Sequence, residues 1–389
     1  MKNVGNLQLR FLKRRTFIVV SACVLIWPAA LSAQQYQQQN LVSNIGGLGA
    51  TTIDPSLVDP WGIARRTTSP WWVADRATGV STLYTAGSML YYGTTESKIP
   101  LVVTIPHTPQ TAKGSPTGIV FNGSNDFALA PGKPAIFLFV SLDGTISGWN
   151  PGVSPNLAIE KVPGSTDSVL TGATIAQIGD RRFLYVADIR RGELAVYDTN
   201  FNRVKVGEHD FDYDELAFTD EFIPKEFVPF NVQNIGNNLY VAFAQQNQAK
   251  NFVMFGAGLG FVDVFSPRGR LLMRLEPGDW FNAPWGLVLA STDFGTFSHK
   301  LIVGQFGSGE ILAFDAITGR FNGKLRDQNN NVIVIPGLWG ISFGAGQPSP
   351  QSSGPANALF FNAGIYRGNG GLFGDLTPIP SELTQGGDQ

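Results

Sequence analysis

Short apolar runs, bounded by glycine, proline or polar residues, recur along the chain after its N-terminal segment. In the first such group the runs are 62–64, 71–75, 80–84 and 101–105. Their short length and their content of aromatic and β-branched residues favour β-strands over helices. We therefore expect an all-β fold.

The first run belongs to a repeated unit. Pro-Trp-Gly-Ile-Ala begins at Pro60, returns as Pro-Trp-Gly-Leu-Val at Pro284 and returns again as Leu-Trp-Gly-Ile-Ser at Leu338. More divergent copies begin at Pro116, Leu170 and Pro229. The spacing between successive copies stays between 54 and 59 residues, and a fixed period of this size indicates radial repetition of one supersecondary unit.

Each period contains further strand-like runs. The second runs lie at 136–140, 183–187, 239–243, 301–304 and 358–361, and the third runs at 145–149, 193–198, 260–265, 310–315 and 371–376. Four strands per period are typical of a propeller blade. The last period lacks a fourth strand, which the N-terminal run 41–45 could supply, closing the ring and leaving no free sheet edge.

The predicted fold is therefore a six-bladed β-propeller of four-stranded blades, closed by an N-terminal strand. We place it at residues 34–380, followed by a polar tail at 381–389. The composition agrees: 43% of the residues are hydrophobic and 15% are charged, which suits a large core. A net charge of −2 gives no electrostatic reason to expect nucleic-acid binding.

Residues 1–33 are predicted to be a cleaved signal peptide, because arginines precede an apolar run that ends in Leu-Ser-Ala at Ala33. Arg14 and Arg15 also resemble a twin-arginine signal, so both export routes stay open, and an uncleaved anchor is the alternative. We expect export to the periplasm or the extracellular space, without a transmembrane span in the mature chain. Cleavage would remove Cys23, the only cysteine, and exclude disulfides.

Aromatic residues share one position of the repeat: Trp61, Phe230, Trp285 and Trp339. Six-fold geometry would gather them around one mouth of the central channel, where they could stack on a sugar or another flat ligand. The alternative is packing between blades. Two inserts, 204–227 and 245–258, interrupt the period, and long loops of this kind are either functional or mobile.

The next position of the repeat is a glycine, or Asn231 in the fourth copy. Either positive φ or close approach of the inner strands at the axis would explain it. Asp75 and Asp188, which both end second strands, are interpreted as turn-forming residues that accept from nearby backbone N–H groups.

Motifs for catalysis are absent from the sequence: it has no nucleophile elbow, no zinc-protease motif and no phosphate-binding loop. Calcium needs several oxygen ligands, and Asp59 and Asn231 are the candidate ligands near the axis. The alternating Asp210, Asp212 and Asp214 could also bind a metal, or could form a solvated acidic loop.

Several segments carry a resemblance: Leu-Val-Ser-Asn at Leu41, Asp-Pro-Trp-Gly-Ile at Asp59, Ser-Pro-Thr-Gly-Ile-Val-Phe-Asn at Ser115, Pro-Phe-Asn-Val-Gln at Pro229 and Ala-Pro-Trp-Gly-Leu at Ala283. In this order they resemble an uncharacterised family of exported bacterial proteins. More distantly, the repeats are similar to the NHL and gluconolactonase-like six-bladed propellers. That second resemblance implies calcium-dependent lactone hydrolysis, although the acidic metal ligands of those enzymes have no position-by-position match here.

These observations lead to two hypotheses of function, and a purely structural role stays open as a third because fold does not imply function. The first is an exported, non-enzymatic and monomeric propeller that binds a protein or carbohydrate partner through one face. The alternative is a lactonase, another hydrolase or a lyase that depends on a divalent metal at the channel mouth, with Ca²⁺ as the candidate ion.

Overall fold

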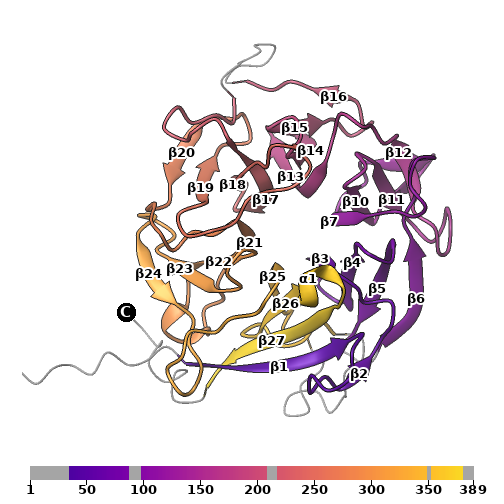
Figure 1. Ribbon diagram of the computed structural model, residues 1–389. Helices are drawn as coiled ribbons and strands as arrows, with labels where there is room; N and C mark the ends of the chain where they lie inside the picture. The colour runs from indigo at the N-terminus through magenta and orange to yellow at the C-terminus, as the bar shows by residue number, and fades with distance from the viewer. Residues whose placement is uncertain (1–34, 87–97, 208–216, 348–351, 380–389) are drawn as a thin grey trace, which may run out of the picture. The chain divides into compact units, whose positions relative to one another are not determined.

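The computed structural model describes residues 35–86, 98–207, 217–347 and 352–379, which all belong to the compact unit Gln34–Gln389. Six sheets stand around a central axis, with one inner strand of each sheet facing that axis (Figure 1). Helical structure within these residues is limited to two short turns, α1 (Ile365–Gly368) and a 3-10 turn (Gly295–Phe297). The predicted six-bladed β-propeller is confirmed.

Each blade runs from an inner strand at the axis to an outer strand at the rim. The first blade consists of β3 (Pro60–Ala64), β4 (Trp71–Asp75), β5 (Val80–Tyr84) and β6 (Lys98–Thr104). The second consists of β7 (Pro116–Phe121), β10 (Phe137–Ser141), β11 (Ile146–Trp149) and β12 (Ile159–Val162). The third consists of β13 (Leu170–Ile178), β14 (Arg181–Asp188), β15 (Glu193–Tyr197) and β16 (Arg203–Val204).

The fourth blade consists of β17 (Phe227–Ile235), β18 (Asn238–Gln245), β19 (Phe261–Phe265) and β20 (Leu271–Arg274). The fifth consists of β21 (Pro284–Leu289), β22 (Leu301–Gln305), β23 (Ile311–Phe314) and β24 (Phe321–Lys324). All six copies of the repeated unit lie in inner strands, which explains their common sequence. A separate hairpin, β8 (Ala128–Ala130) and β9 (Lys133–Pro134), extends the connection between β7 and β10.

The last blade joins both ends of the described chain. It contains β25 (Leu338–Phe343), β26 (Leu359–Ala363), β27 (Leu372–Pro378), β1 (Tyr36–Ser43) and a short parallel strand, β2 (Thr52–Ile53). β1 completes the last blade, as predicted, by pairing antiparallel with β27, but it begins and ends earlier than the apolar run 41–45. Its polar residues 37–39 are exposed and pair through the backbone, which needs no apolar side chain.

The repeated glycines allow neighbouring inner strands to approach closely. A Cβ on Gly62 would lie 2.5 Å from the Thr117 carbonyl oxygen of the next blade. The same carbonyl contact recurs where a Cβ on Gly286 would lie 2.7 Å from the Trp339 carbonyl oxygen and where a Cβ on Gly340 would lie 2.7 Å from the Trp61 carbonyl oxygen, which closes the ring. None of the repeated glycines has a positive φ, so close approach at the axis is the reason for them.

Several sequence predictions fall outside the described residues. These are the signal peptide 1–33 with Cys23, the acidic residues Asp210, Asp212 and Asp214, and the tail 381–389. Within the ranges that are described, no helix has the length and apolar character needed to span a membrane.

Candidate ligand-binding site at the channel mouth

The four aromatic residues of the repeat meet at the axis. Trp61 and Trp339 stack with ring centroids 3.6 Å apart, and Trp285 meets Trp61 edge-on at 6.2 Å. Phe230 contacts Trp339 at 5.8 Å. Their exposed fractions are only 4% or less, so the rings pack between blades and form an aromatic cluster across the channel. Their role in contacting a ligand stays a prediction.

A buried carboxylate fixes two of these rings. The Trp61 indole N–H donates to Asp59 Oδ2 at 3.0 Å, and the Trp339 indole N–H donates to Asp59 Oδ1 at 3.4 Å. Arg76 Nε also donates to Asp59 Oδ2 and forms an ion pair with it. Charge-assisted hydrogen bonds of this kind are strong, so Asp59 holds the first and last blades together at the axis.

A cavity of about 730 Å³ lies on the aromatic cluster, with Trp61 and Trp339 in its lining. Loops between second and third strands surround it: Arg76 follows β4, Leu142 follows β10 and Phe306 follows β22. Phe306 stacks on Trp339 at 4.1 Å. We call this space the mouth cavity.

The insert after β18 also reaches the mouth cavity. Phe252 and Phe255 of this loop belong to its lining, and Phe252 meets Trp61 edge-on at 6.2 Å. The Phe255 side chain is 59% exposed. The second insert of the sequence analysis therefore brings aromatic side chains back to the axis.

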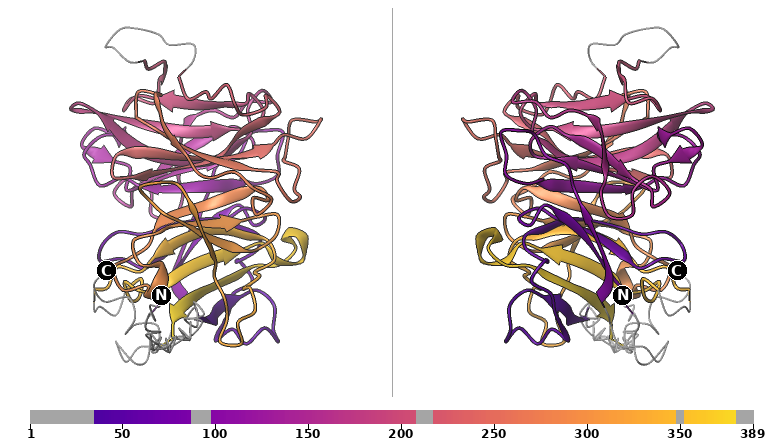
Figure 2. Two further views of the ribbon diagram at one scale, coloured as in Figure 1. Left: turned by 90° about the vertical axis from the view of Figure 1, so that its left-hand side faces the viewer. Right: turned by 90° about the vertical axis from the view of Figure 1, so that its right-hand side faces the viewer.

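α1 forms one wall of the mouth cavity with an unusual backbone. Tyr366, Arg367 and Gly368 are consecutive and have φ of 52°, 60° and 80°. Left-handed residues other than glycine cost about 1–2 kcal/mol each, and such strained residues cluster at binding sites. The turn projects from the face of the ring (Figure 2), and both Tyr366 and Arg367 are exposed.

Gly364, at the start of this turn, lies directly against Asp59. A Cβ at Gly364 would collide with Asp59 Oδ1 and would lie 3.1 Å from the Trp339 indole nitrogen. The turn therefore packs on the same carboxylate that fixes the aromatic cluster.

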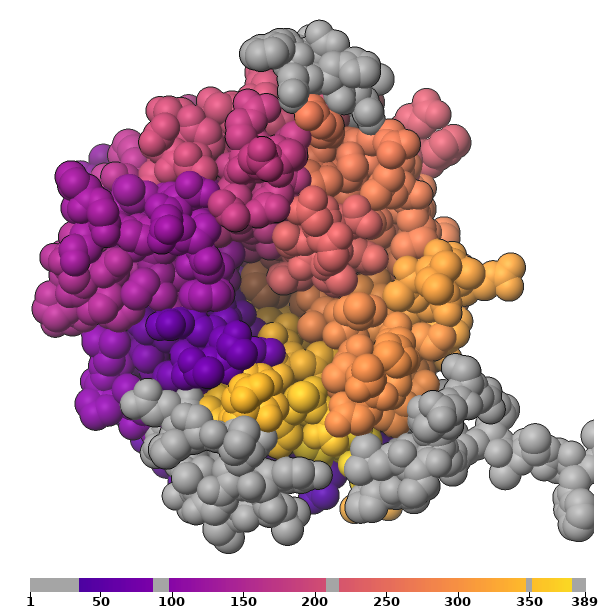
Figure 3. All heavy atoms as spheres, turned by 180° about the vertical axis from the view of Figure 1, so that it is seen from behind, coloured from indigo at the N-terminus to yellow at the C-terminus, as the bar shows by residue number. Residues whose placement is uncertain are grey.

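The two candidate calcium ligands are not brought together. Asp59 lines the mouth cavity, whereas Asn231 lines a second cavity of about 30 Å³ that shares no lining residue with it. Asn231 Nδ2 donates to the Trp285 carbonyl oxygen at 2.7 Å. The face opposite to that of Figure 1 is also hollowed at the axis (Figure 3).

The donor set at Asp59 does not fit a divalent cation. Its carboxylate already accepts from two indole N–H groups and from Arg76, so a cation would meet a neighbouring positive charge. In the described ranges no three His, Cys, Asp or Glu side chains gather as metal ligands. Asp59 has a structural role here that explains its position before the repeat.

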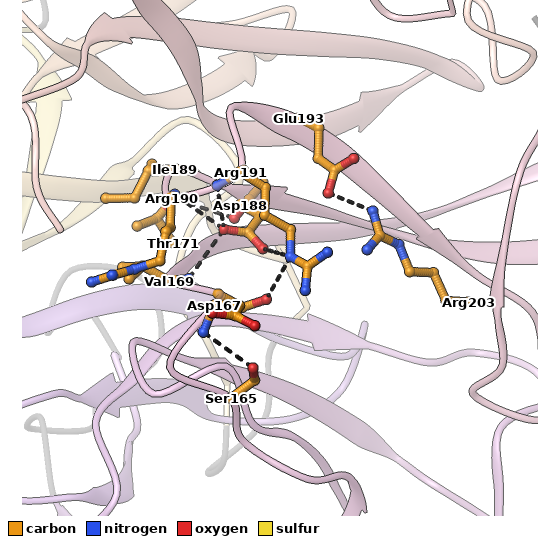
Figure 4. Close-up of polar contacts among 12 residues, drawn as sticks. Ser165, Asp167, Val169, Thr171, Asp188, Ile189, Arg190, Arg191, Glu193 and Arg203 are labelled. Carbon is orange, nitrogen blue, oxygen red and sulfur yellow. Dashed lines mark hydrogen bonds and ion pairs between the residues drawn. The ribbon is translucent and has the colours of Figure 1, made fainter. Parts of the chain in front are cut away.

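The two strand-ending aspartates behave differently. Asp188 Oδ1 accepts from the backbone N–H groups of Val169, Arg190 and Arg191 at 3.1–3.2 Å, which confirms a turn-forming role (Figure 4). Asp75 instead accepts from the backbone N–H and hydroxyl of Thr82, in the facing strand β5. Burial raises the pKa of Asp75 well above its usual range, against the lowering effect of the Thr82 hydrogen bonds.

No protein-family model matches the chain. It is 31% identical over 344 residues to uncharacterized protein R648 of Acanthamoeba polyphaga mimivirus, an alignment that spans 86% of this chain and 78% of R648. The chain belongs to the family of R648. Uncharacterized protein L690 of the same virus is 29% identical over 86% of this chain and 84% of its own length. The expected bacterial family finds no support in these relatives, which are viral.

Solved structures with a similar backbone include a virginiamycin B lyase from Staphylococcus aureus, with 11% identity, a TM-score of 0.46, and coverage of 89% of this chain and 99% of that one. A protein of unknown function from Bacteroides thetaiotaomicron has 12% identity and a TM-score of 0.48, over 88% of this chain and 76% of that one. Likeness at this level says nothing about the activity of this chain.

Sequence reasoning missed most of the mouth cavity's wall. Arg76 and Phe306 each follow a second strand directly, so an alignment of these positions between repeats could have indicated them. Phe252, Tyr366 and Arg367 lie in longer versions of the same connections, β18–β19 and β26–β27. The repeat does not indicate these positions, although Phe252 falls within the insert 245–258.

Proposed function

We propose that the protein is a non-enzymatic binding protein that holds a carbohydrate in the mouth cavity. The observation that carries this proposal is an aromatic-lined cavity of about 730 Å³ at the axis. Small-ligand sites in proteins commonly enclose about 300–1,000 Å³. Aromatic rings offer flat apolar faces that suit the C–H faces of a sugar.

The most accessible of these rings are Phe255 and Tyr366, which stand on different blades and are each 59% exposed. The floor, where Phe252 and Phe306 lie on Trp61 and Trp339, is rigid because the two tryptophan rings are buried and held by Asp59. A rigid floor with two accessible rings above it can take a sugar with little loss of side-chain freedom.

A small ligand suits this site better than a protein partner, because the accessible rings stand around a hollow and not on a flat surface. A stable protein interface would need about 800 Å² on each partner. No arrangement of acids in the mouth cavity favours the alternative, a metal-dependent lactonase, hydrolase or lyase: Asp59 is the only acidic residue in its described lining. Binding without catalysis is therefore the proposal.

The test is a glycan array on the full chain, followed by titration calorimetry with the glycans that bind. Tyr366→Ala and Phe255→Ala should each weaken binding about tenfold, which corresponds to about 1.4 kcal/mol. Phe222→Ala is the matched control, because Phe222 is 75% exposed and does not line the mouth cavity. The proposal is wrong if no glycan binds, or if the three variants bind as the unchanged chain does.

Export is part of the proposal and is supported by the N-terminal pattern of arginines followed by an apolar run up to Ala33. N-terminal sequencing of the protein recovered outside the cytoplasm should begin at Gln34.

A further inference from the structure

We infer that the ligand of the mouth cavity carries a carboxylate, so that the carbohydrate is an acidic sugar of the uronic acid class. This inference rests on the proposed function and adds the charge of the ligand to it. Its basis is the presence of two guanidinium groups, Arg76 and Arg367, in the lining of one cavity.

The negative charge in the lining is already engaged. Asp59 accepts from Arg76 and from the indole N–H groups of Trp61 and Trp339, and only 6% of its side chain is exposed. With two arginines against one aspartate, the lining keeps a net positive charge. An anion that enters the mouth cavity is therefore attracted by the two guanidinium groups. Arg76, which pairs with Asp59, offsets the repulsion from the Asp59 carboxylate.

The guanidinium groups keep free donors. Arg76 uses Nε for Asp59, and neither its terminal nitrogens nor any nitrogen of Arg367 donates to a group within the described ranges. A guanidinium presents its N–H groups in a planar fork that matches the two oxygens of a carboxylate. The pairing with Asp59 also fixes the position of Arg76 before a ligand arrives.

Arg367 has a left-handed backbone conformation, which costs free energy for a residue other than glycine. It is the middle residue of the left-handed run of α1, with φ of 60°, and this turn packs on Asp59 through Gly364. An arginine needed only for solubility would not require this conformation, whereas a residue that must face the mouth cavity would. The apolar floor and the charged wall together match a sugar ring with a carboxylate substituent.

The test compares di- and trisaccharides of galacturonic and glucuronic acid with their methyl esters, which lack the negative charge and carry one added methyl group at the carboxyl. The acids should bind at least tenfold more tightly than the esters, and their Kd should rise with salt because screening weakens the charge attraction. Arg367→Gln should remove most of this preference. Arg320→Gln is the matched control, since Arg320 is exposed in the β23–β24 turn and does not line the mouth cavity.

Arg76→Gln should have the same direction of effect, but Arg367→Gln is decisive because Arg367 pairs with no described residue and its loss leaves Asp59 undisturbed. If esters bind as tightly as acids, and Phe255→Ala still weakens both, the carboxylate inference is overturned while carbohydrate binding stands. If the acid preference persists in Arg367→Gln and Arg76→Gln, the assignment to these arginines is overturned. If neither acids, esters nor any glycan of the array binds, both proposals fail.

Discussion

Gly340→Ala should weaken the junction between the last blade and the first. A Cβ at this position would lie 2.7 Å from the Trp61 carbonyl oxygen and 2.9 Å from Ile63 Cγ2. The oxygen belongs to the backbone of β3, so it cannot turn aside as a side chain could. Two inner strands must separate by several tenths of an ångström, and overpacking of this kind costs about 1–3 kcal/mol.

Urea denaturation, followed by tryptophan fluorescence, measures this cost directly. Gly46→Ala is the control, because Gly46 is exposed and a Cβ there would meet no atom within 4 Å. We expect Gly340→Ala to lower the free energy of unfolding by about 2 kcal/mol relative to that control. Equal stability of the two variants would refute the argument that close approach of inner strands requires the repeated glycine.

Two further predictions concern carboxylates. Burial raises the pKa of Asp263 to about 6, from 3.8, even though Arg274 Nε donates to it at 3.0 Å and lowers it. The folded protein therefore binds the proton of the Asp263 carboxyl more tightly than the unfolded chain does. The stability that this bound proton contributes is lost as pH rises from about 4 through about 6. Asp263→Asn should therefore gain up to about 3 kcal/mol relative to the unchanged protein between about pH 4 and pH 7, measured by denaturation at each pH; parallel curves would contradict this. Asp59→Asn should lower the free energy of unfolding by about 2 kcal/mol, since it weakens three charge-assisted hydrogen bonds. Calcium should leave the Tm of both Asp59 forms unchanged, and a saturable rise would show instead that the site takes the ion.

The ring of six blades could be predicted from sequence because the inner strand of every blade carries the repeated unit and packs on the inner strand of the next blade. Gly62, Gly286 and Gly340 face the same contact with the next blade, so the sequence repeats where the geometry repeats. Closure by β1 was predictable from the missing strand of the last period. The polar start of β1 was not, because residues 37–39 pair through their backbone alone and carry no apolar signal.

The candidate site was predictable only where it reuses the repeat. Trp61 and Trp339 were expected at the axis and do meet there. Their near-complete burial follows from Phe252 and Phe306, which cover them and which no periodic pattern indicated. Arg367 owes its position to a left-handed turn in the β26–β27 connection, and local propensity argues against such a turn.

The shared last blade also sets the order in which the molecule can be completed. Ser43 of β1 hydrogen-bonds to the Gly371 carbonyl oxygen, 328 residues further along the chain. At about 5–20 residues per second, a ribosome needs roughly 15–65 s to make the intervening segment. During that interval the five blades from β3 to β24, each built from one continuous stretch, can form in turn, while β1 waits without its partner. The last blade can therefore be completed only after the chain has been translated through to β27, which pairs with β1.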